Sequence, residues 1–122
     1  MKQFLIKIPP WERRLLVVVT KNRQTVLDLI KKHKLGRDLR NQVFGDPLTE
    51  ADLGAVYTDK KYGRWIMWFT KWNNSGDNMD TLVHETNHIV KFLMKYVGAK
   101  NELETSAYTQ EWLFREIRKR LK

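Results

Sequence analysis

The first third of the chain shows two short apolar segments followed by a helical pattern. Residues 3–8 alternate loosely between apolar and polar positions before two prolines, and residues 14–20 form an apolar, β-branched run typical of a buried strand. These two segments predict a β-hairpin. Apolar positions then recur at helical spacing from Asn22, a favoured N-cap residue type, to Gly36, a residue type that often ends helices. This pattern predicts the first helix.

The middle of the chain has stronger strand signals than helix signals. Residues 37–53 are polar and irregular, contain a turn-like Gly-Asp-Pro sequence, and predict no regular element. Residues 55–58 and 64–70 predict a second hairpin, whose later strand is apolar on both faces. The tryptophans around this later strand are expected mostly in the core: Trp65, Trp68 and Trp72.

The end of the chain predicts two helices, at about residues 78–97 and 102–121. Gly98 is expected to end the first helix, and Asn101 is expected to cap the second. The predicted order is strand, strand, helix, strand, strand, helix, helix. It indicates the α+β class, with one domain over residues 1–122 that has a small four-stranded sheet, one N-terminal helix, a motif helix and a C-terminal helix.

The first of these C-terminal helices contains the sequence HETNH at residues 84–88, which matches the HExxH pattern. Positions four apart on a helix share one face, about 5–6 Å apart at Cβ, so His84 and His88 can bind one ion. In a zinc hydrolase these histidines bind Zn²⁺, and Glu85 is the general base that accepts a proton from metal-activated water. We expect both histidines on the core-facing stripe that contains Ile89. The alternative is two ordinary helix histidines, one packed and one half exposed.

One Zn²⁺ per chain requires a third protein ligand, while hydrolysis requires a fourth position left open. Carboxylates of the last helix are the candidates: Glu102, Glu104 and Glu111. Glu104 is preferred, because folding the last helix back places its first turns opposite the motif helix. It also neighbours Leu103 and Ala107, which are expected in the core. The alternative is a capping box, in which the Glu104 carboxylate accepts from the backbone amide of Asn101.

Together with the segment Glu104-x-x-Ala107-Tyr108, the HExxH motif resembles the zincin metallopeptidases of the gluzincin type. It is more narrowly similar to short zincin-like proteins encoded in bacteriophage genomes. The resemblance covers residues 80–122 and, in outline, residues 54–72. It implies a minimal zincin-like domain and a zinc-dependent metallopeptidase, an enzyme that hydrolyses a peptide bond in a peptide or protein substrate. It also implies that the strand before the motif helix offers its edge to an extended substrate.

One position departs from the larger family. Gluzincins carry an acidic residue four positions after the ligand glutamate, where this chain has Tyr108. Asp80 and Glu111 are therefore the candidates for accepting the second ring N–H of the zinc-binding histidines. Tyr108 is a candidate donor to the tetrahedral oxyanion, with a buried, structural tyrosine as the alternative.

The charge of the chain allows other functions. Among 122 residues, 23 are Lys or Arg and 14 are Asp or Glu, which gives a formal net charge of +9. Basic clusters within residues 31–40, 60–64 and 115–122 suit a nucleic-acid-binding module, but no signature of sequence-specific nucleic-acid recognition is present and none is expected. The same charge suits an acidic partner surface or acidic substrates. A further alternative is a catalytically silent zinc-binding scaffold that binds a partner without cleaving it.

Composition also limits the metal chemistry and the location. The chain has no cysteine, which excludes disulfides, a thiol nucleophile and thiolate-bound zinc, so a metal must be bound by histidine, carboxylate or carbonyl groups. Neither a signal-peptide core nor an apolar run long enough for a transmembrane helix is present. We therefore expect no membrane interaction and a cytoplasmic location, in the host cell if the chain is phage-encoded.

Overall fold

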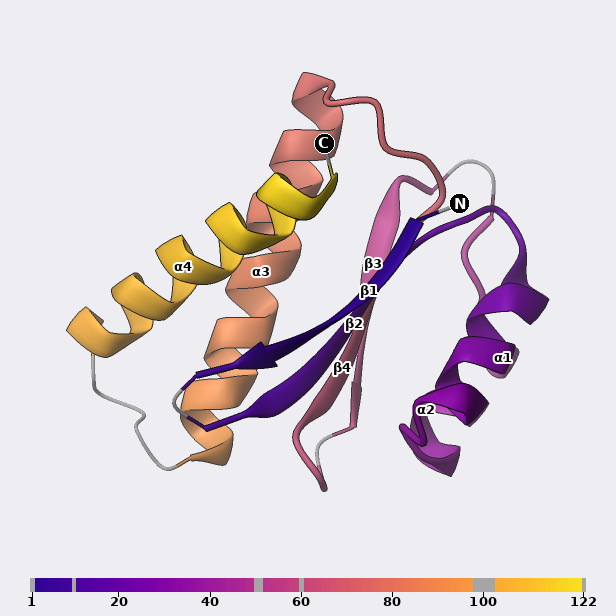
Figure 1. The fold of residues 1–122 in the computed structure, drawn as a ribbon, viewed down its shortest axis with the longest axis horizontal. Coiled ribbons are helices and arrows are strands. Elements are labelled where there is room, and N and C mark those ends of the chain that lie inside the picture. The colour runs from indigo at the N-terminus through magenta and orange to yellow at the C-terminus, as the bar shows by residue number, and fades with distance from the viewer. Residues whose placement is uncertain (1, 10, 50–51, 60, 98–102, 122) are drawn as a thin grey trace.

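The computed structural model describes residues 2–9, 11–49, 52–59, 61–97 and 103–121 (Figure 1). In chain order its elements are β1 (Lys2–Ile8), β2 (Arg13–Val19), α1 (Arg23–Lys32), α2 (Arg37–Gly45), β3 (Gly54–Asp59), β4 (Arg64–Phe69), α3 (Gly76–Tyr96) and α4 (Leu103–Leu121). The predicted α+β class is confirmed. Within these ranges, no helix is both long and apolar enough to cross a membrane.

The four strands form one mixed sheet in the order β1-β2-β4-β3. Both predicted hairpins are confirmed, because β1 pairs antiparallel with β2 and β3 pairs antiparallel with β4. β2 and β4 are parallel neighbours, with Val17 opposite Met67. The chain crosses between them through α1, α2 and β3. β1 and β3 are therefore the two outer strands of this sheet.

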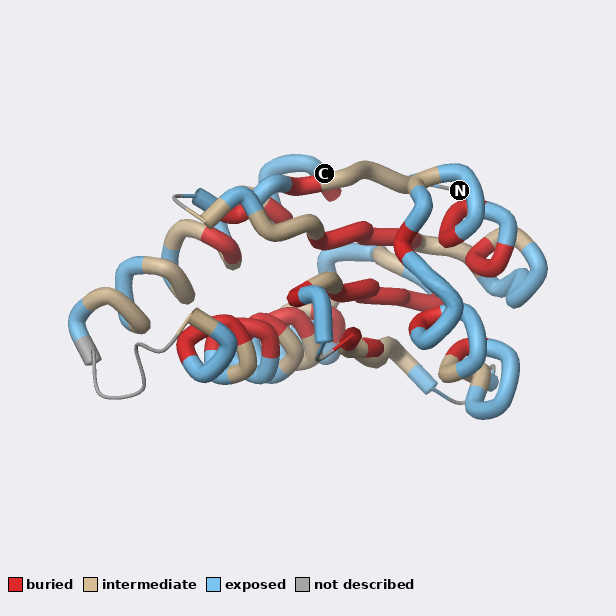
Figure 2. Tube along the Cα trace, turned by 90° about the horizontal axis from the view of Figure 1, so that it is seen from below, coloured by how far each residue is buried: buried red, intermediate tan, exposed pale blue. Residues whose placement is uncertain are grey.

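Helices cover both faces of the sheet (Figure 1, Figure 2). α3 and α4 pack on the face that carries Trp65, Met67 and Phe69, whereas α1 and α2 pack on the face that carries Ile66 and Trp68. All of these β4 side chains are buried. The prediction that β4 is apolar on both faces is confirmed, since successive strand residues point to opposite faces and both faces are covered.

The segment between the two hairpins differs from the prediction. Residues 37–53 are predicted as irregular, which is wrong for Arg37–Gly45, because these residues form α2. Leu39 and Val43, one turn apart, are its buried residues and attach it to the sheet. Two buried positions in so short a helix give little periodicity, which explains the missed element. Gly36 is the N-cap of α2, with a φ angle of 101°, and does not end α1.

The predicted cap of α1 is confirmed. The Asn22 side chain accepts hydrogen bonds from the backbone N–H groups of Gln24 and Thr25, at 2.8 and 3.4 Å. The caps predicted at Gly98 and Asn101 lie outside the described residues.

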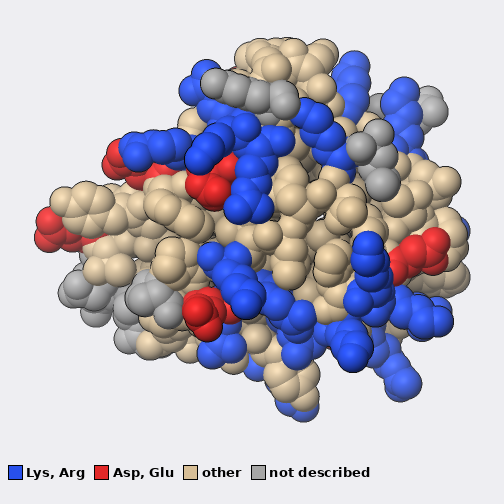
Figure 3. All heavy atoms as spheres, in the orientation of Figure 1, with Lys and Arg blue, Asp and Glu red and all other residues tan. Residues whose placement is uncertain are grey.

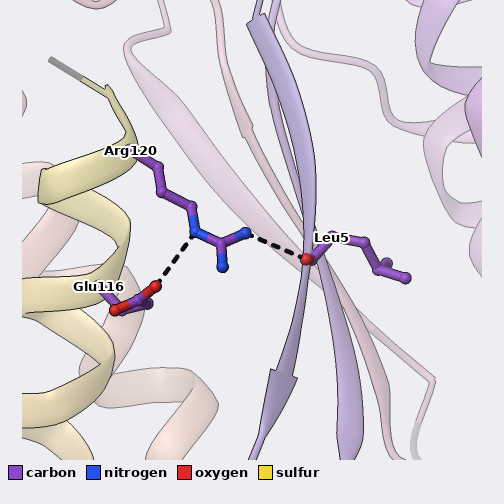
Figure 4. A network of polar contacts seen from close by, with 3 residues as sticks. All are labelled: Leu5, Glu116 and Arg120. Carbon is purple, nitrogen blue, oxygen red and sulfur yellow. Dashed lines mark hydrogen bonds and ion pairs between the residues drawn. The ribbon is translucent and has the colours of Figure 1, made fainter.

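Helix α4 is attached to the outer strand β1. Its buried apolar residues are Leu113, Ile117 and Leu121. Arg120 donates through Nη1 to the carbonyl oxygen of Leu5 at 3.4 Å and through Nε to the Glu116 carboxylate at 3.1 Å (Figure 4). The Lys2 ammonium donates to the carbonyl oxygen of Leu121 at 2.8 Å. Both apolar burial and polar contacts therefore hold α4 against this side of the sheet.

Candidate active site

The HExxH motif lies in the middle of α3, and the predicted helix is confirmed. The helix begins after its N-cap Ser75, and its buried side includes Leu82, Thr86, Ile89 and Leu93. His84 and His88 are exposed, so the prediction that they share this buried stripe with Ile89 is wrong. Each histidine is two residues from the buried Thr86, which places it about 200° around the helix.

The two histidine rings meet at the surface of α3. Nε2 of His84 lies 3.0 Å from Nε2 of His88, and the ring planes are nearly perpendicular, at 88°. One nitrogen donates to the other when both rings are neutral. Two Nε2 atoms bound to one tetrahedral zinc ion at about 2.0–2.1 Å would be roughly 3.3 Å apart. The pair therefore has nearly the separation that a shared zinc ion requires.

Glu85 lies on the side of α3 that faces β3. Its side chain is half-buried, and this burial raises the pKa of its carboxyl group above the usual value. The charges of His84 and His88 oppose the rise in pKa, as does a hydrogen bond from the backbone N–H of Val56. Val56 belongs to the outer strand β3 and pairs with Met67 of β4. The carboxylate therefore connects the motif to the edge of the sheet.

A polar contact fixes α4 beside the motif. Gln110 of α4 donates through Nε2 to the Thr86 hydroxyl at 2.7 Å, and this hydroxyl donates to the carbonyl oxygen of Leu82 at 2.8 Å. Gln110 Nε2 also lies 3.4 Å from the carbonyl oxygen of Val83. Sequence reasoning missed this contact, because a threonine at a variable position of HExxH and a glutamine on another helix carry no pairing signal.

Glu104 lies apart from the histidine pair in the structure. Among the described residues, no group of three or more His, Asp or Glu side chains is placed to hold one metal ion. Glu104 is exposed at the beginning of α4, the end of this helix that lies away from α3 (Figure 1, Figure 2). Ala107 is exposed too, so its predicted place in the core is wrong. Glu102 and the capping partner Asn101 lie outside the described residues.

The other predicted site residues are on exposed helix surfaces. Tyr108 is 65% exposed, so the alternative of a buried, structural tyrosine is wrong. Glu111 forms an ion pair with Arg115, one turn along α4. Asp80, one turn before His84, is exposed. Within the described ranges, His84 and His88 form a hydrogen bond with each other and none with Asp80 or Glu111.

Comparisons with known proteins assign no family to this chain. The chain has no significant match among models of protein families, curated proteins or solved structures. The candidate site therefore stands on the motif helix, the histidine pair and the contact of Glu85 with β3.

Proposed function

We propose that this chain is a zinc-dependent metallopeptidase in which His84 and His88 bind one zinc ion. The observation that carries the proposal is the 3.0 Å separation of their Nε2 atoms, close to that of two imidazoles on one tetrahedral zinc ion. Zinc is favoured over calcium or magnesium, because imidazole nitrogen is a preferred zinc ligand whereas the harder cations prefer oxygen.

Glu104 is the proposed third ligand, on the basis of its place in the Glu-x-x-Ala-Tyr segment. A carboxylate beside two imidazoles completes a donor set used by hydrolytic zinc sites. The described structure does not gather Glu104 with the histidines. Its role as a ligand therefore needs a test separate from that of the histidines.

Glu85 is the proposed proton-transfer group. Bound zinc would supply Lewis-acid activation of water and of the substrate carbonyl. Glu85 accepts a proton from the attacking water and returns it to the leaving amine, so it acts first as a base and then as an acid. The hydrogen bond from Val56 holds the carboxylate beside β3. An extended peptide substrate would lie along this outer strand.

Zinc content and peptide cleavage test the proposal together. Reconstituted protein should contain one zinc ion per chain by elemental analysis and should cleave members of a peptide library in a chelator-sensitive reaction. The variant His84→Ala/His88→Ala should lose both properties. His33→Ala is the matched control, since it changes the third of the three histidines of the chain and should retain both. Absence of zinc from the reconstituted parent contradicts the proposal.

The third ligand is tested by zinc affinity. Glu104→Gln keeps the size of the side chain and removes its charge, so it should weaken zinc binding substantially if Glu104 is a ligand. Glu116→Gln, on the same helix and paired with Arg120, is the control and should leave the affinity unchanged. Unchanged affinity in Glu104→Gln would assign the third position to another group.

A catalytically silent zinc-binding scaffold is the second candidate. The observation that favours it is that His84 and His88 are exposed on the surface of α3, which is open to a binding partner. A scaffold needs the two histidines but has no use for a base at Glu85. Glu85→Gln therefore distinguishes the two functions.

A further inference from the structure

The parallel strands β2 and β4 finish side by side at one end of the sheet, with Val19 opposite Phe69. From there the chain continues from β2 into α1 on one face of the sheet and from β4 into α3 on the other face (Figure 1). In open sheets with helices on both faces, ligands bind outside the carboxyl ends of the strands, where neighbouring connections leave toward opposite faces. The topology therefore favours a binding site at this end of β2 and β4.

A cavity of about 430 Å³ lies at this place and is called here the lysine cavity. It is lined by the beginning of β1, the residues that follow β2 and β4, and the last turn of α4, and by no residue of the HExxH motif. Its rim is fixed, because the backbone N–H of Thr20 donates to the carbonyl oxygen of Phe69 at 3.0 Å and Trp68 Nε1 donates to the carbonyl oxygen of Thr20 at 2.7 Å. Pockets for small organic molecules have volumes of roughly 300–1,000 Å³. The size of the cavity therefore suits a small molecule.

Three lysines of the cavity lie on the same side of the sheet. Val19 and Phe69 are opposite each other and pack on the face that α3 and α4 cover. Lys2 is opposite Val19 in the pairing of β1 with β2, so it shares this face. Lys21 and Lys71 come two residues after Val19 and Phe69, which places them on the same side beyond the end of the strands. All three lysines line the cavity.

The charge of the lining favours a phosphate group. Among the described residues that line the cavity, three are lysines and none is Asp or Glu. The Lys2 ammonium donates to the carbonyl oxygen of Leu121 at 2.8 Å, which holds it at the cavity. Lys and Arg are spread widely over the surface seen in Figure 3, so net charge alone does not single out this place. Three ammonium groups around one cavity do, because lysine is a compact point charge that suits phosphate, whereas a planar carboxylate matches the fork of arginine.

Trp72 adds an aromatic surface to the lysine cavity. Its side chain lines the cavity and is partly exposed. The ring is held by a hydrogen bond from Nε1 to Oδ1 of Asn74 at 3.0 Å and by an edge-to-face contact with Phe69, with the ring centroids 5.2 Å apart. A fixed aromatic ring beside cationic groups suits a nucleotide, because every nucleobase has a π face that can stack on it.

We propose that the lysine cavity binds a nucleotide, with its phosphates on Lys2, Lys21 and Lys71 and its base on Trp72. The confined volume favours a single nucleotide over a nucleic-acid strand, which needs a basic groove that continues along several nucleotides. Binding needs neither zinc nor the motif histidines. The proposal is therefore independent of the proposed function.

Calorimetric titration with ADP, in the presence of a chelator and about 150 mM salt, tests the phosphate contacts. The parent should bind ADP, and Lys21→Gln/Lys71→Gln should bind it at least about ten-fold more weakly, since each change removes a charged contact. Both positions are exposed, and circular dichroism checks the fold. Lys31→Gln/Lys32→Gln is the matched control. It removes the same charge at the other end of α1 and should bind ADP like the parent.

Comparison of ADP with inorganic pyrophosphate tests the contact with the base. Pyrophosphate has the same two phosphates without a base, so the parent should bind ADP about ten-fold more tightly. Trp72→Leu keeps an apolar side chain against Phe69 and should remove this preference. Trp72→Phe serves if the leucine variant does not fold, and its smaller ring should lose part of the preference. Full preference in the variant that folds contradicts a base on Trp72.

Absence of ADP binding by the parent overturns the proposal, as does an equal loss of affinity in the two double-lysine variants. Equal affinity of the parent for ADP and pyrophosphate overturns it too, because a nucleotide site must sense the base. Tighter binding of a single-stranded oligonucleotide at Lys21 and Lys71 would replace the nucleotide with a nucleic acid. His84→Ala/His88→Ala should bind ADP like the parent. A failure of zinc binding or cleavage therefore leaves this result intact.

Discussion

The two outer strands of the sheet are contacted by helix side chains of opposite charge. Outer strands present backbone groups that have no ladder partner. At β1, Arg120 of α4 donates to the carbonyl oxygen of Leu5 and is itself paired with Glu116. At β3, the Glu85 carboxylate of α3 accepts from the backbone N–H of Val56. A cation thus satisfies a carbonyl at one edge, and an anion satisfies an amide at the other.

The partners of these two charges differ: Arg120 has the surroundings of a structural contact, whereas those of Glu85 suit the proton-transfer role proposed for it. Arg120 has a carboxylate partner within its own helix. Glu85 has no Lys or Arg ion pair in the described ranges and instead lies beside the paired histidines, half-buried. It also occupies one N–H group of β3. A peptide added to this strand would therefore pair with the neighbours of Val56, with Glu85 at its side.

The largest expected effect is on cleavage by Glu85→Gln. This change keeps the shape of the side chain and removes the base, so peptide cleavage should fall by about 10²- to 10⁴-fold. Zinc content and fold should match those of the parent. Cleavage is measured with a peptide that the parent cuts in a chelator-sensitive reaction.

Glu116→Gln is the matched control, because it removes the carboxylate from the other edge of the sheet. It should leave cleavage unchanged. If Glu85→Gln keeps the biological activity of the parent while neither protein cuts the library, the scaffold function replaces the peptidase.

The second largest effect concerns how α4 is held to the sheet. Ile117 is fully buried in the core beneath α4. Ile117→Ala should lower the free energy of unfolding by about 2–5 kcal/mol, since the lost burial and the remaining cavity add together. Urea unfolding measures the change. Val83→Ala, at a half-exposed position of α3, should cost no more than about 0.5 kcal/mol. Equal losses of stability in the two variants would mean that the burial of Ile117 does not hold α4 to the sheet.

The sequence predicts which segments form strands better than it predicts which strands lie side by side in the sheet. Continuous apolar character identifies β4 as a strand covered on both faces. The Asn22 cap and helical periodicity identify α1, and periodicity identifies α3. The parallel pairing of β2 with β4 is not predictable in this way, because two strands far apart in the chain carry no local signal of their pairing. The short helix α2 is also not predicted from the sequence, because Leu39 and Val43 are its only buried residues.

The candidate site, too, is only partly predictable from the sequence. Local spacing predicts that His84 and His88 meet, since one helix determines their separation. It does not predict that they face solvent. Thr86 takes the buried position instead, because its hydroxyl is satisfied by the carbonyl of Leu82 and by Gln110 from α4. Buried polar residues of this kind are invisible to an apolar pattern, as is any ligand that must come from another helix.

A smaller effect is expected from Tyr57, which lies on the face of β3 opposite to that of Val56. The Tyr57 hydroxyl donates to the carbonyl oxygen of Asp46 at 2.6 Å, and burial raises the pKa of Tyr57 from 10.0 to about 12. Tyr57→Phe should cost about 0.5–1.5 kcal/mol at neutral pH through loss of this hydrogen bond. A raised pKa gives stability that is fully present below pH 10 and lost as the pH rises through 12.

The stability of the parent should therefore fall more steeply than that of Tyr57→Phe between pH 10 and 12. Urea unfolding of both proteins across this range provides the measurement. Tyr62→Phe, at an exposed position, is the control and should follow the parent. Parallel stability curves for the parent and Tyr57→Phe would contradict the statement that burial raises the pKa of Tyr57.

The smallest effect is expected at the Arg120 contact with β1. The side chain is 43% exposed, its bond to Leu5 is long at 3.4 Å, and its ion pair with Glu116 lies on the helix surface. Exposed pairs of this kind contribute about 0.2–1 kcal/mol, because water and salt screen the charges and the side chains lose freedom. Arg120→Gln should therefore lower the free energy of unfolding by less than about 1 kcal/mol and leave cleavage unchanged. The loss should shrink further at 1 M salt, whereas the loss in Ile117→Ala should not. A large, salt-insensitive loss in Arg120→Gln would mean that the polar contact, and not the burial of Ile117, holds α4 to this edge.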